Sequence, residues 1–248
     1  AASDVYKRQQ INIACLPPRK SEMRRSISYY ENVLKKLPIK FELGHEFTSA
    51  DADGYDEIVV ATGAKSLHPR IPGIDNTNVL DSWNVLSGEA IPYGKIAVCG
   101  GGLVGTETAE YLAQRGYKVS IIEMKEKIAA EESSTILPFM MADFKEHQTE
   151  LLPLHKILEF TNEGVKTEVI DKDGNKVGEE LVKADTIINA LSSVKVLPNL
   201  DGVAKPIHYV GDCAGERPSN IEHAIKSAYD VAVSYTHLRA HETGAYLV

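Results

Sequence analysis

Apolar runs alternate with segments of helical periodicity along most of the chain. Strands are predicted at the following short apolar runs: 39–43, 56–61, 95–99, 118–122, 186–190 and 208–210. Residues 10–15 are predicted as a short strand or the entry to a turn. Helices are predicted where apolar residues recur every three or four positions: 21–37, near Trp83, 103–115, 138–147 and 221–231. Met23, Ile27, Tyr30 and Leu34 share one face of the first helix, and Asp173-Gly174 marks a hairpin turn. This alternation favours an α/β architecture.

A glycine-rich loop stands between the predicted strand 95–99 and the helix that follows it. Gly100 to Gly105 reads Gly-Gly-Gly-Leu-Val-Gly and matches the pattern G-x-G-x-x-G. Gly100 permits the tight turn, Gly102 lets the backbone approach a pyrophosphate, and Gly105 lets helix and strand pack closely. Leu103 and Val104 open the helix, whose unpaired N–H groups and dipole favour an anion. The loop therefore predicts a dinucleotide site, and a strand–helix–strand unit that binds nothing is the alternative.

An acidic residue closes the next predicted strand. Glu123 lies about 20 residues after the loop, where a carboxylate binds the ribose hydroxyls of NAD. A carboxylate at this position repels a 2′-phosphate, so NADH is favoured over NADPH. Lys125 is close enough in sequence to soften that preference.

Three further motifs surround this loop and resemble those of flavoprotein reductases with two dinucleotide-binding domains. Ala61-Thr62-Gly63 is similar to their Ala-Thr-Gly motif, and Ile71-Pro72-Gly73 to their linker into the NAD domain. Val210-Gly211-Asp212 resembles their late FAD motif, in which the aspartate meets the ribityl or pyrophosphate region of the flavin. An ordinary strand-to-loop turn at Thr62-Gly63 and a helix cap at Asp212 are the alternatives. Ala190-Leu191-Ser192 departs from the usual Ala-x-Gly of such reductases.

A narrower resemblance covers about residues 10–232. Asn12 to Pro18, together with Gly100 to Glu110, resembles the C-terminal half of the NADH:flavin oxidoreductases of the old yellow enzyme, 2,4-dienoyl-CoA reductase and trimethylamine dehydrogenase type. The resemblance implies that Glu107 lies near the nicotinamide, whereas a solvated glutamate on the helix face is the alternative. It implies a three-layer α/β fold like that of pyridine nucleotide-disulfide reductases, with a Rossmann-like NAD-binding domain inserted in a partial FAD-binding domain.

The same resemblance implies the cofactors and the reaction. NAD(H) and FAD would bind here, and FMN and a 4Fe–4S cluster would bind in an N-terminal barrel outside this sequence. Hydride would pass from NADH to FAD, and electrons would continue through the cluster to FMN and an enoyl or similar small-molecule acceptor. The alternatives are a standalone FAD-dependent NADH oxidase or ferredoxin-type reductase, and a nucleotide-binding fragment without catalysis.

Both ends of the chain carry a signature of one DNA element. Asp4 to Gln9 can be encoded by a DNA segment whose reverse complement reads, in one frame, as Val233 to His237. This element resembles a sequencing-library adapter, so residues 1–9 and 233–248 are expected to be adapter-derived. Between these ends we expect, in chain order, a partial FAD-binding domain (10–66), an NAD(P)-binding domain (67–198) and a return to the FAD-binding domain (199–232).

The composition indicates which kinds of partner and setting the sequence favours. The net charge is −8 without a basic stripe, which argues against nucleic acid, and no apolar run approaches the length of a membrane helix. Cys15, Cys99 and Cys213 form no C-x-x-C pair and no metal-ligand cluster, and each is expected to be a small buried residue. A reducing, cytoplasmic setting is therefore expected.

Overall fold

The computed structural model describes residues 10–215 and 220–244, which fall into two compact units. The larger unit contains residues 10–39 and 66–192, and the smaller one contains residues 40–65 together with the described part of 193–248. The chain thus leaves the smaller unit after residue 65 and returns to it at residue 193. Residues 10–39 belong to the larger unit although they precede the first strand of the smaller one.

A five-stranded parallel sheet forms the centre of the larger unit, in the order β3-β10-β4-β5-β6. Its strands are β3 (Val79–Asp81), β4 (Lys95–Cys99), β5 (Lys118–Ile122), β6 (Glu150–Leu152) and β10 (Thr186–Asn189). The apolar runs predicted as strands at 95–99, 118–122 and 186–190 are confirmed. These strands are buried on both faces, which explains why their sequences are continuously apolar.

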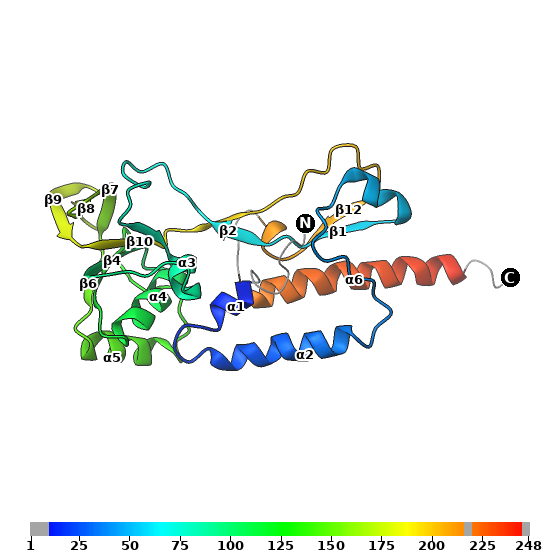
Figure 1. The fold of residues 1–248 in the computed structure, drawn as a ribbon, viewed down its shortest axis with the longest axis horizontal. Coiled ribbons are helices and arrows are strands. Elements are labelled where there is room, and N and C mark those ends of the chain that lie inside the picture. The colour runs from blue at the N-terminus through cyan, green and yellow to red at the C-terminus, as the bar shows by residue number, and fades with distance from the viewer. Residues whose placement is uncertain (1–9, 216–219, 245–248) are drawn as a thin grey trace. The chain divides into compact units, whose positions relative to one another are not determined.

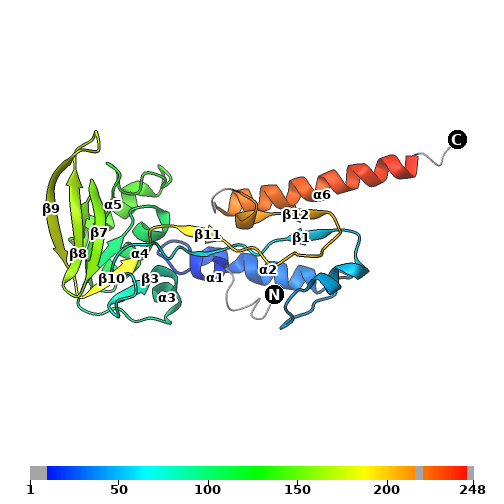
Figure 2. The ribbon, with the colours of Figure 1, turned by 90° about the horizontal axis from the view of Figure 1, so that it is seen from above.

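Two different layers cover the two faces of this sheet (Figures 1 and 2). One layer holds the helices α3 (Ser82–Ser87), α4 (Leu103–Ala113) and α5 (Leu137–Glu146). The other is an antiparallel sheet of β7 (His155–Thr161), β8 (Gly164–Ile170) and β9 (Lys176–Lys183), which contains the predicted hairpin. Alternate residues of β4 enter the two cores: Ile96 and Val98 face the helices, and Ala97 and Cys99 face the antiparallel sheet. The predicted three-layer α/β fold is confirmed.

The segment before the sheet is helical. It contains α1 (Gln10–Ala14), a 3₁₀ turn η1 (Ser21–Met23) and α2 (Arg24–Leu34). Of the two alternatives predicted for 10–15, the short strand was wrong: residues 10–14 are helical, and a turn begins at Cys15. A helix satisfies its own backbone, as when the Cys15 N–H donates to the Ile11 carbonyl, whereas a strand needs a neighbour that this segment lacks. The helix expected over 21–37 forms, but it ends earlier and contains no fully buried residue.

The smaller unit is built around two parallel strands, β1 (Ile58–Val60) and β12 (Ile207–Tyr209). The other elements are η2 (Ser49–Gly54), the paired short strands β2 (Ala64–Ser66) and β11 (Ser193–Lys195), η3 (Gly211–Cys213) and α6 (Ile221–Gly244). The strands predicted at 56–61 and 208–210 are confirmed in type. The helix predicted from Ile221 continues beyond its expected end.

One further strand prediction was wrong. Residues 39–43 form no strand in the structure, and Ile39, Phe41 and Leu43 are exposed. Their alternating pattern supplies one apolar face, but no described strand pairs with this segment, so its backbone gains no ladder of hydrogen bonds.

Three expectations from the sequence concern the cysteines, membrane-spanning helices and the chain ends. Cys15, Cys99 and Cys213 are buried and free, as expected. Within the described part of the chain, none of the helices combines the length and the apolarity needed to cross a bilayer. Residues 1–9 and 245–248 lie outside the described residues and residues 233–244 continue α6, and the adapter origin expected for 1–9 and 233–248 stays a prediction.

Candidate functional site

Two glycines of the glycine-rich loop are required by the packing of the protein itself. Gly100 has a φ of +112°, and a Cβ there would lie 2.4 Å from the carbonyl oxygen of Ala190. A Cβ on Gly105 would lie 1.9 Å from the carbonyl oxygen of Gly100. Both distances are far inside van der Waals contact. The loop therefore turns tightly at Gly100, and α4 packs directly against it at Gly105.

Gly102 differs from these two glycines because nothing in the protein requires it. It is the N-cap residue of α4, and a Cβ there would meet no atom within 4 Å. The helix also begins without a side-chain cap, so no side chain satisfies the amides of its first turn. Leu103 and Val104 form that turn, and Val104 is exposed. An open backbone at an uncapped helix N-terminus is the geometry that binds a phosphate group.

Glu123 is held beside this loop by two backbone hydrogen bonds. Its Oε2 accepts from the Gly101 N–H at 2.7 Å, and its Oε1 accepts from the Lys125 N–H at 2.8 Å. The two bonds fix the carboxylate at the carboxyl edge of the sheet, where β4 and β5 are neighbours. Each oxygen keeps a lone pair that can accept from a ribose hydroxyl. The ammonium of Lys125 pairs with Glu131 at 3.3 Å.

Glu107 lies one turn into α4 and is almost completely buried. Its carboxylate pairs with the ammonium of Lys20. Burial raises the pKa of the Glu107 carboxyl, and the neighbouring Lys20 opposes that shift. Glu107 is therefore buried, and the alternative interpretation, a solvated glutamate on the helix face, is wrong.

A second ion pair beside it was not predicted from the sequence. Arg19 bridges α4 and α5: its guanidinium pairs with Glu110 and, at 2.9 Å, with Asp143. Burial raises the pKa of the Glu110 carboxyl to about 7. No spacing signal in Pro17-Pro18-Arg19-Lys20 indicates that its two cations meet carboxylates about 90 or more residues away.

In the smaller unit, the two motifs assigned to the flavin side lie together. Ala61-Thr62-Gly63 follows β1, and Gly211-Asp212 follows β12, at the carboxyl ends of two paired parallel strands. The Val210 N–H donates to the Val60 carbonyl, which extends the pairing to the start of the motifs. Gly63 and Gly211 both have a φ of +69°. Loops at the carboxyl ends of parallel strands are the usual place for a nucleotide in α/β proteins.

Hydrogen bonds to α6 and to β1 also hold the Gly211 loop in place. The Gly211 N–H donates to the Ser227 hydroxyl of α6 at 2.8 Å, and the Cys213 thiol donates to the Val60 carbonyl at 3.2 Å. Ser192, which replaces a glycine of similar reductases, accepts from the Leu67 N–H and does not have a positive φ. The chain exits the larger unit without the left-handed turn that glycine would allow.

The structure thus contains two carboxyl-edge sites, each inside one unit. The structure brings together the residues predicted for the NAD(H) phosphates and ribose: Gly100, Gly102, Leu103, Val104, Gly105 and Glu123. Residues suited to hold part of FAD are Ala61, Thr62, Gly63, Gly211 and Asp212. Among the residues that the structure describes, no three His, Cys, Asp or Glu side chains gather as metal ligands.

Two candidate dinucleotide sites on separate units are the arrangement expected of a flavoprotein reductase with two nucleotide-binding domains. The sequence model of the pyridine nucleotide-disulphide oxidoreductases matches residues 7–193, and the chain belongs to this family. The family consists of FAD-dependent NAD(P)H oxidoreductases, so the chain comes from an enzyme of that class.

Curated relatives are similar over most of the chain. Bilirubin reductase of Mediterraneibacter gnavus is 38% identical over 231 residues, which cover 89% of this chain and 34% of that protein. NADH oxidase of Thermoanaerobacter brockii is 28% identical over 237 residues, or 90% of this chain and 35% of that protein. The chain spans about one third of the length of these relatives.

Solved structures agree with this assignment. A 2-naphthoyl-CoA reductase in complex with 2-naphthoyl-CoA matches with a TM-score of 0.77 and 26% identity, covering 89% of this chain and 33% of that one. Histamine dehydrogenase from Rhizobium sp. 4-9 has a TM-score of 0.75 at 14% identity, covering 90% of this chain and 38% of that one, and shows a common fold.

Proposed function

We propose that the chain is the NADH-oxidising, electron-input portion of a flavin-dependent oxidoreductase. The observation that carries this proposal is the open backbone of Gly102 at the uncapped start of α4, beside the fixed carboxylate of Glu123. When bound, NADH supplies a hydride and FAD accepts it. The residues of the chain bind and orient the two nucleotides. Direct hydride transfer requires proximity and orientation more than it requires a side-chain acid.

On the nicotinamide-nucleotide side, each residue has a separate task. The amides of the first turn of α4, from Leu103 and Val104, bind the pyrophosphate, and Gly102 leaves room for it. Glu123 accepts from the ribose hydroxyls, and its negative charge disfavours a 2′-phosphate. The Lys125 ammonium is partly neutralised by Glu131, so it does little to attract that phosphate. NADH is therefore the favoured nucleotide.

Glu107 is proposed to lie toward the nicotinamide end of the bound nucleotide. Its place one turn after the pyrophosphate-binding amides supports this position. Its pairing with Lys20 supplies a countercharge to the carboxylate in a buried setting.

On the flavin side, the loops after β1 and β12 hold part of FAD. Thr62 and Gly63 form one wall, and Gly211 and Asp212 form the other. The parallel pairing of the two strands supports this assignment because it brings both loops to one edge. We assign residues 40–66 and 199–232 to the FAD-binding domain and residues 67–198 to the NAD(P)-binding domain; residues 10–39, expected on the FAD side, group with the larger unit instead.

The acceptor lies beyond these residues. Since the chain spans about one third of its relatives, we propose an N-terminal barrel with FMN and a 4Fe–4S cluster that reduces an enoyl or similar conjugated compound. The names bilirubin reductase and cinnamate reductase among the relatives support such an acceptor. The name NADH oxidase supports a second candidate, a flavoprotein that passes electrons directly to oxygen.

Titration of the full chain with NADH, followed by nicotinamide fluorescence, tests the proposal. Gly102→Ala should weaken NADH binding about tenfold, because a methyl group enters the space of the pyrophosphate. Gly178→Ala is the matched control, since a Cβ at Gly178 also meets no protein atom but lies on β9, away from the site. Equal NADH affinity in both variants and the wild type would show that the nucleotide does not bind at the glycine-rich loop.

A further inference from the structure

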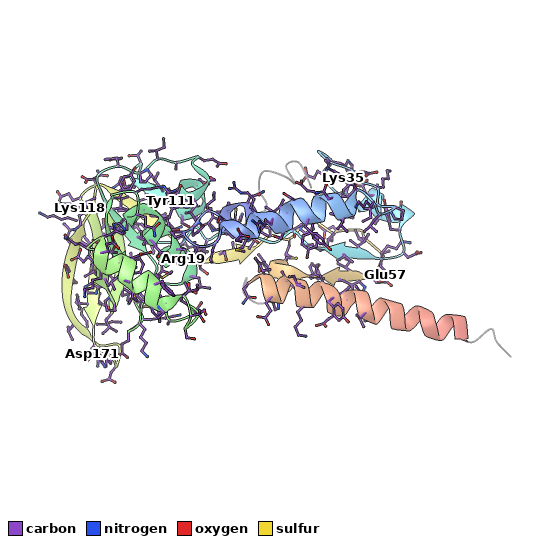
Figure 3. The ribbon with its side chains drawn as sticks, turned by 90° about the horizontal axis from the view of Figure 1, so that it is seen from below. Arg19, Lys35, Glu57, Tyr111, Lys118 and Asp171 are labelled. Atoms are coloured by element: carbon purple, nitrogen blue, oxygen red, sulfur yellow. The ribbon has the colours of Figure 1, made fainter. Side chains whose placement is uncertain are left out.

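Residues 10–39 join the larger unit through a small group of charged side chains. Arg19 comes from this segment, Glu110 from α4, Gln114 from the C-cap of α4, and Asp143 from α5. We call these four residues the Arg19 cluster. Lys20 adds a neighbouring pair with Glu107 on the same helix. Figure 3 labels Arg19, which lies beside the helices of the larger unit.

The Arg19 cluster ties three separate parts of the chain together. The guanidinium donates through one nitrogen to Asp143 and through the other to Glu110, which lie 124 and 91 residues away in sequence. The Gln114 amide donates to the same Asp143 oxygen at 2.9 Å. Arg19 also has a φ of +64°, which is unfavourable for a residue with a side chain. These contacts hold a strained residue in place.

The charges of this region do not balance if every group is ionised. Three carboxylates, Glu107, Glu110 and Asp143, face two cations, Arg19 and Lys20. Glu110 is the deepest of the three, with a side chain only 1% exposed. A buried excess charge is costly unless it is neutralised. One proton on the Glu110–Asp143 pair removes the excess.

From this geometry we propose that the Arg19 cluster is a proton-linked clamp that holds residues 15–20 on α4 and α5. With the proton present, Glu110 donates to Asp143 and the pair carries one negative charge opposite the Arg19 guanidinium. Without it, two adjacent carboxylates share one guanidinium in a buried site, and the segment releases more readily.

The direction of the pH effect follows from the raised pKa of Glu110. When the segment is docked, burial raises the pKa of this carboxyl to about 7, and Asp143 raises it further against the opposing effect of Arg19. The Asp143 carboxyl has a lowered pKa because Glu110 donates a hydrogen bond to it. When the segment is released, Glu110 is solvated and titrates in its ordinary range. Docking is therefore strongest in acid and weakens as pH rises to about 7.

Cys15 reports on docking because it is buried in the same segment. Its rate of labelling by a maleimide can be measured by peptide mass spectrometry, with buried Cys99 as an internal measure of global unfolding. The ratio of the wild-type rate to the Glu110→Gln rate cancels the intrinsic pH dependence of the thiol. Glutamine still donates to Asp143 but cannot lose a proton. Glu22→Gln serves as the control, since Glu22 is an exposed acid of the same segment.

We expect the Cys15 ratio of wild type to Glu110→Gln to be near one in mild acid and to rise by about tenfold or more in mild alkali, since each unit of pKa shift corresponds to a factor of ten. The Cys99 ratio and the Glu22→Gln ratio should stay near one. A Cys15 ratio independent of pH, or an equal rise at Cys99, would overturn the proposal. So would faster labelling of Glu110→Gln than of the wild type in acid.

A second variant keeps the test decisive if Glu110→Gln folds poorly. Arg19→Gly relieves the positive φ but removes the guanidinium. Cys15 should then label faster at every pH while Cys99 remains protected. Unchanged protection of Cys15 in this variant would show that the guanidinium does not hold the segment.

Discussion

The two units present their nucleotide motifs on very different scaffolds. In the larger unit, the glycine-rich loop and Glu123 stand on a five-stranded sheet that is covered on both faces. In the smaller unit, the motifs at Thr62-Gly63 and Gly211-Asp212 stand on two paired strands, and Val59 of this pair is 55% exposed. A loop on a doubly covered sheet has its position fixed by packing, whereas a loop on a strand pair depends on a few local hydrogen bonds.

The glycines show the same contrast in detail. A side chain at Gly100 or Gly105 would collide with backbone atoms, but one at Gly211 would only meet Ala224 at 3.7 Å. The shape of the NAD(H) loop is thus determined inside the larger unit. The Gly211 loop is held by its positive φ and by the hydrogen bond that the Gly211 N–H donates to the Ser227 hydroxyl.

The largest expected effect is therefore on the stability of the larger unit. Gly105→Ala should lower its free energy of unfolding by about 3 kcal/mol, because the backbone must move to admit the methyl group. Trp83, the single tryptophan of the sequence, lies in α3 and reports on this unit in chemical denaturation. Gly211→Ala should leave the Trp83 transition in place, since it strains only the other unit. An equal shift of the Trp83 transition in both variants would contradict this difference between the two units.

A smaller effect is expected on nucleotide choice. Glu123→Ser removes a charge-assisted acceptor, so NADH should bind about tenfold more weakly. The affinity for NADPH relative to NADH should rise, because the repulsion of the 2′-phosphate is lost. Competitive titration of the two nucleotides measures this ratio. An unchanged ratio would contradict the ribose role of Glu123.

The pH dependence of stability gives a third test. The folded-state pKa of Glu110 is raised to about 7, so the folded protein binds this proton more tightly than the unfolded chain does. Its contribution to stability is complete below the ordinary range of a glutamate and is lost as pH rises through about 7. The loss should be on the order of 1–2 kcal/mol. In denaturation curves at several pH values, Glu110→Gln should flatten this slope; an equal slope would refute the assignment.

The smallest effect is expected from a surface ion pair. Glu131→Gln frees the Lys125 ammonium, which lies two residues after the ribose-binding carboxylate. The affinity for NADPH relative to NADH should rise about twofold to threefold, in the range of an exposed pair. Lys172 pairs with Glu126 nearby, so Glu126→Gln is the matched control and should leave the ratio unchanged.

Sequence patterns predicted those elements of the fold whose structure is determined by the burial and the steric demands of their own residues. The strands at 95–99 and 118–122 are buried on both faces, so their continuous apolar runs identified them. The runs at 10–15 and 39–43 look similar in sequence but have no described strand beside them, and pairing is not written in a single segment. The glycine pattern identified the loop because Gly100 and Gly105 each answer a local steric demand, whereas the space beside Gly102 is open.

The charged contacts of α4 could not be predicted in the same way. Arg19 and Lys20 meet Glu110 and Glu107 only because the chain folds back over about 90 residues. No periodicity or motif spacing encodes such a pair. The family resemblance singles out Glu107 as a residue near the nicotinamide, but its burial and its pairing with Lys20 are properties of the folded unit.

We propose that a nicotinamide dinucleotide binds at the carboxyl edge of the five-stranded sheet, between the start of α4 and Glu123. NMR chemical-shift mapping of the full chain during NADH addition is the sharpest test of this placement. We expect saturable shifts of the Gly102, Leu103 and Glu123 amides, with the hairpin at Asp173-Gly174 unaffected. Shifts confined to the opposite edge of the sheet, at Lys95 and Lys118, or no saturable shifts at all, would contradict it.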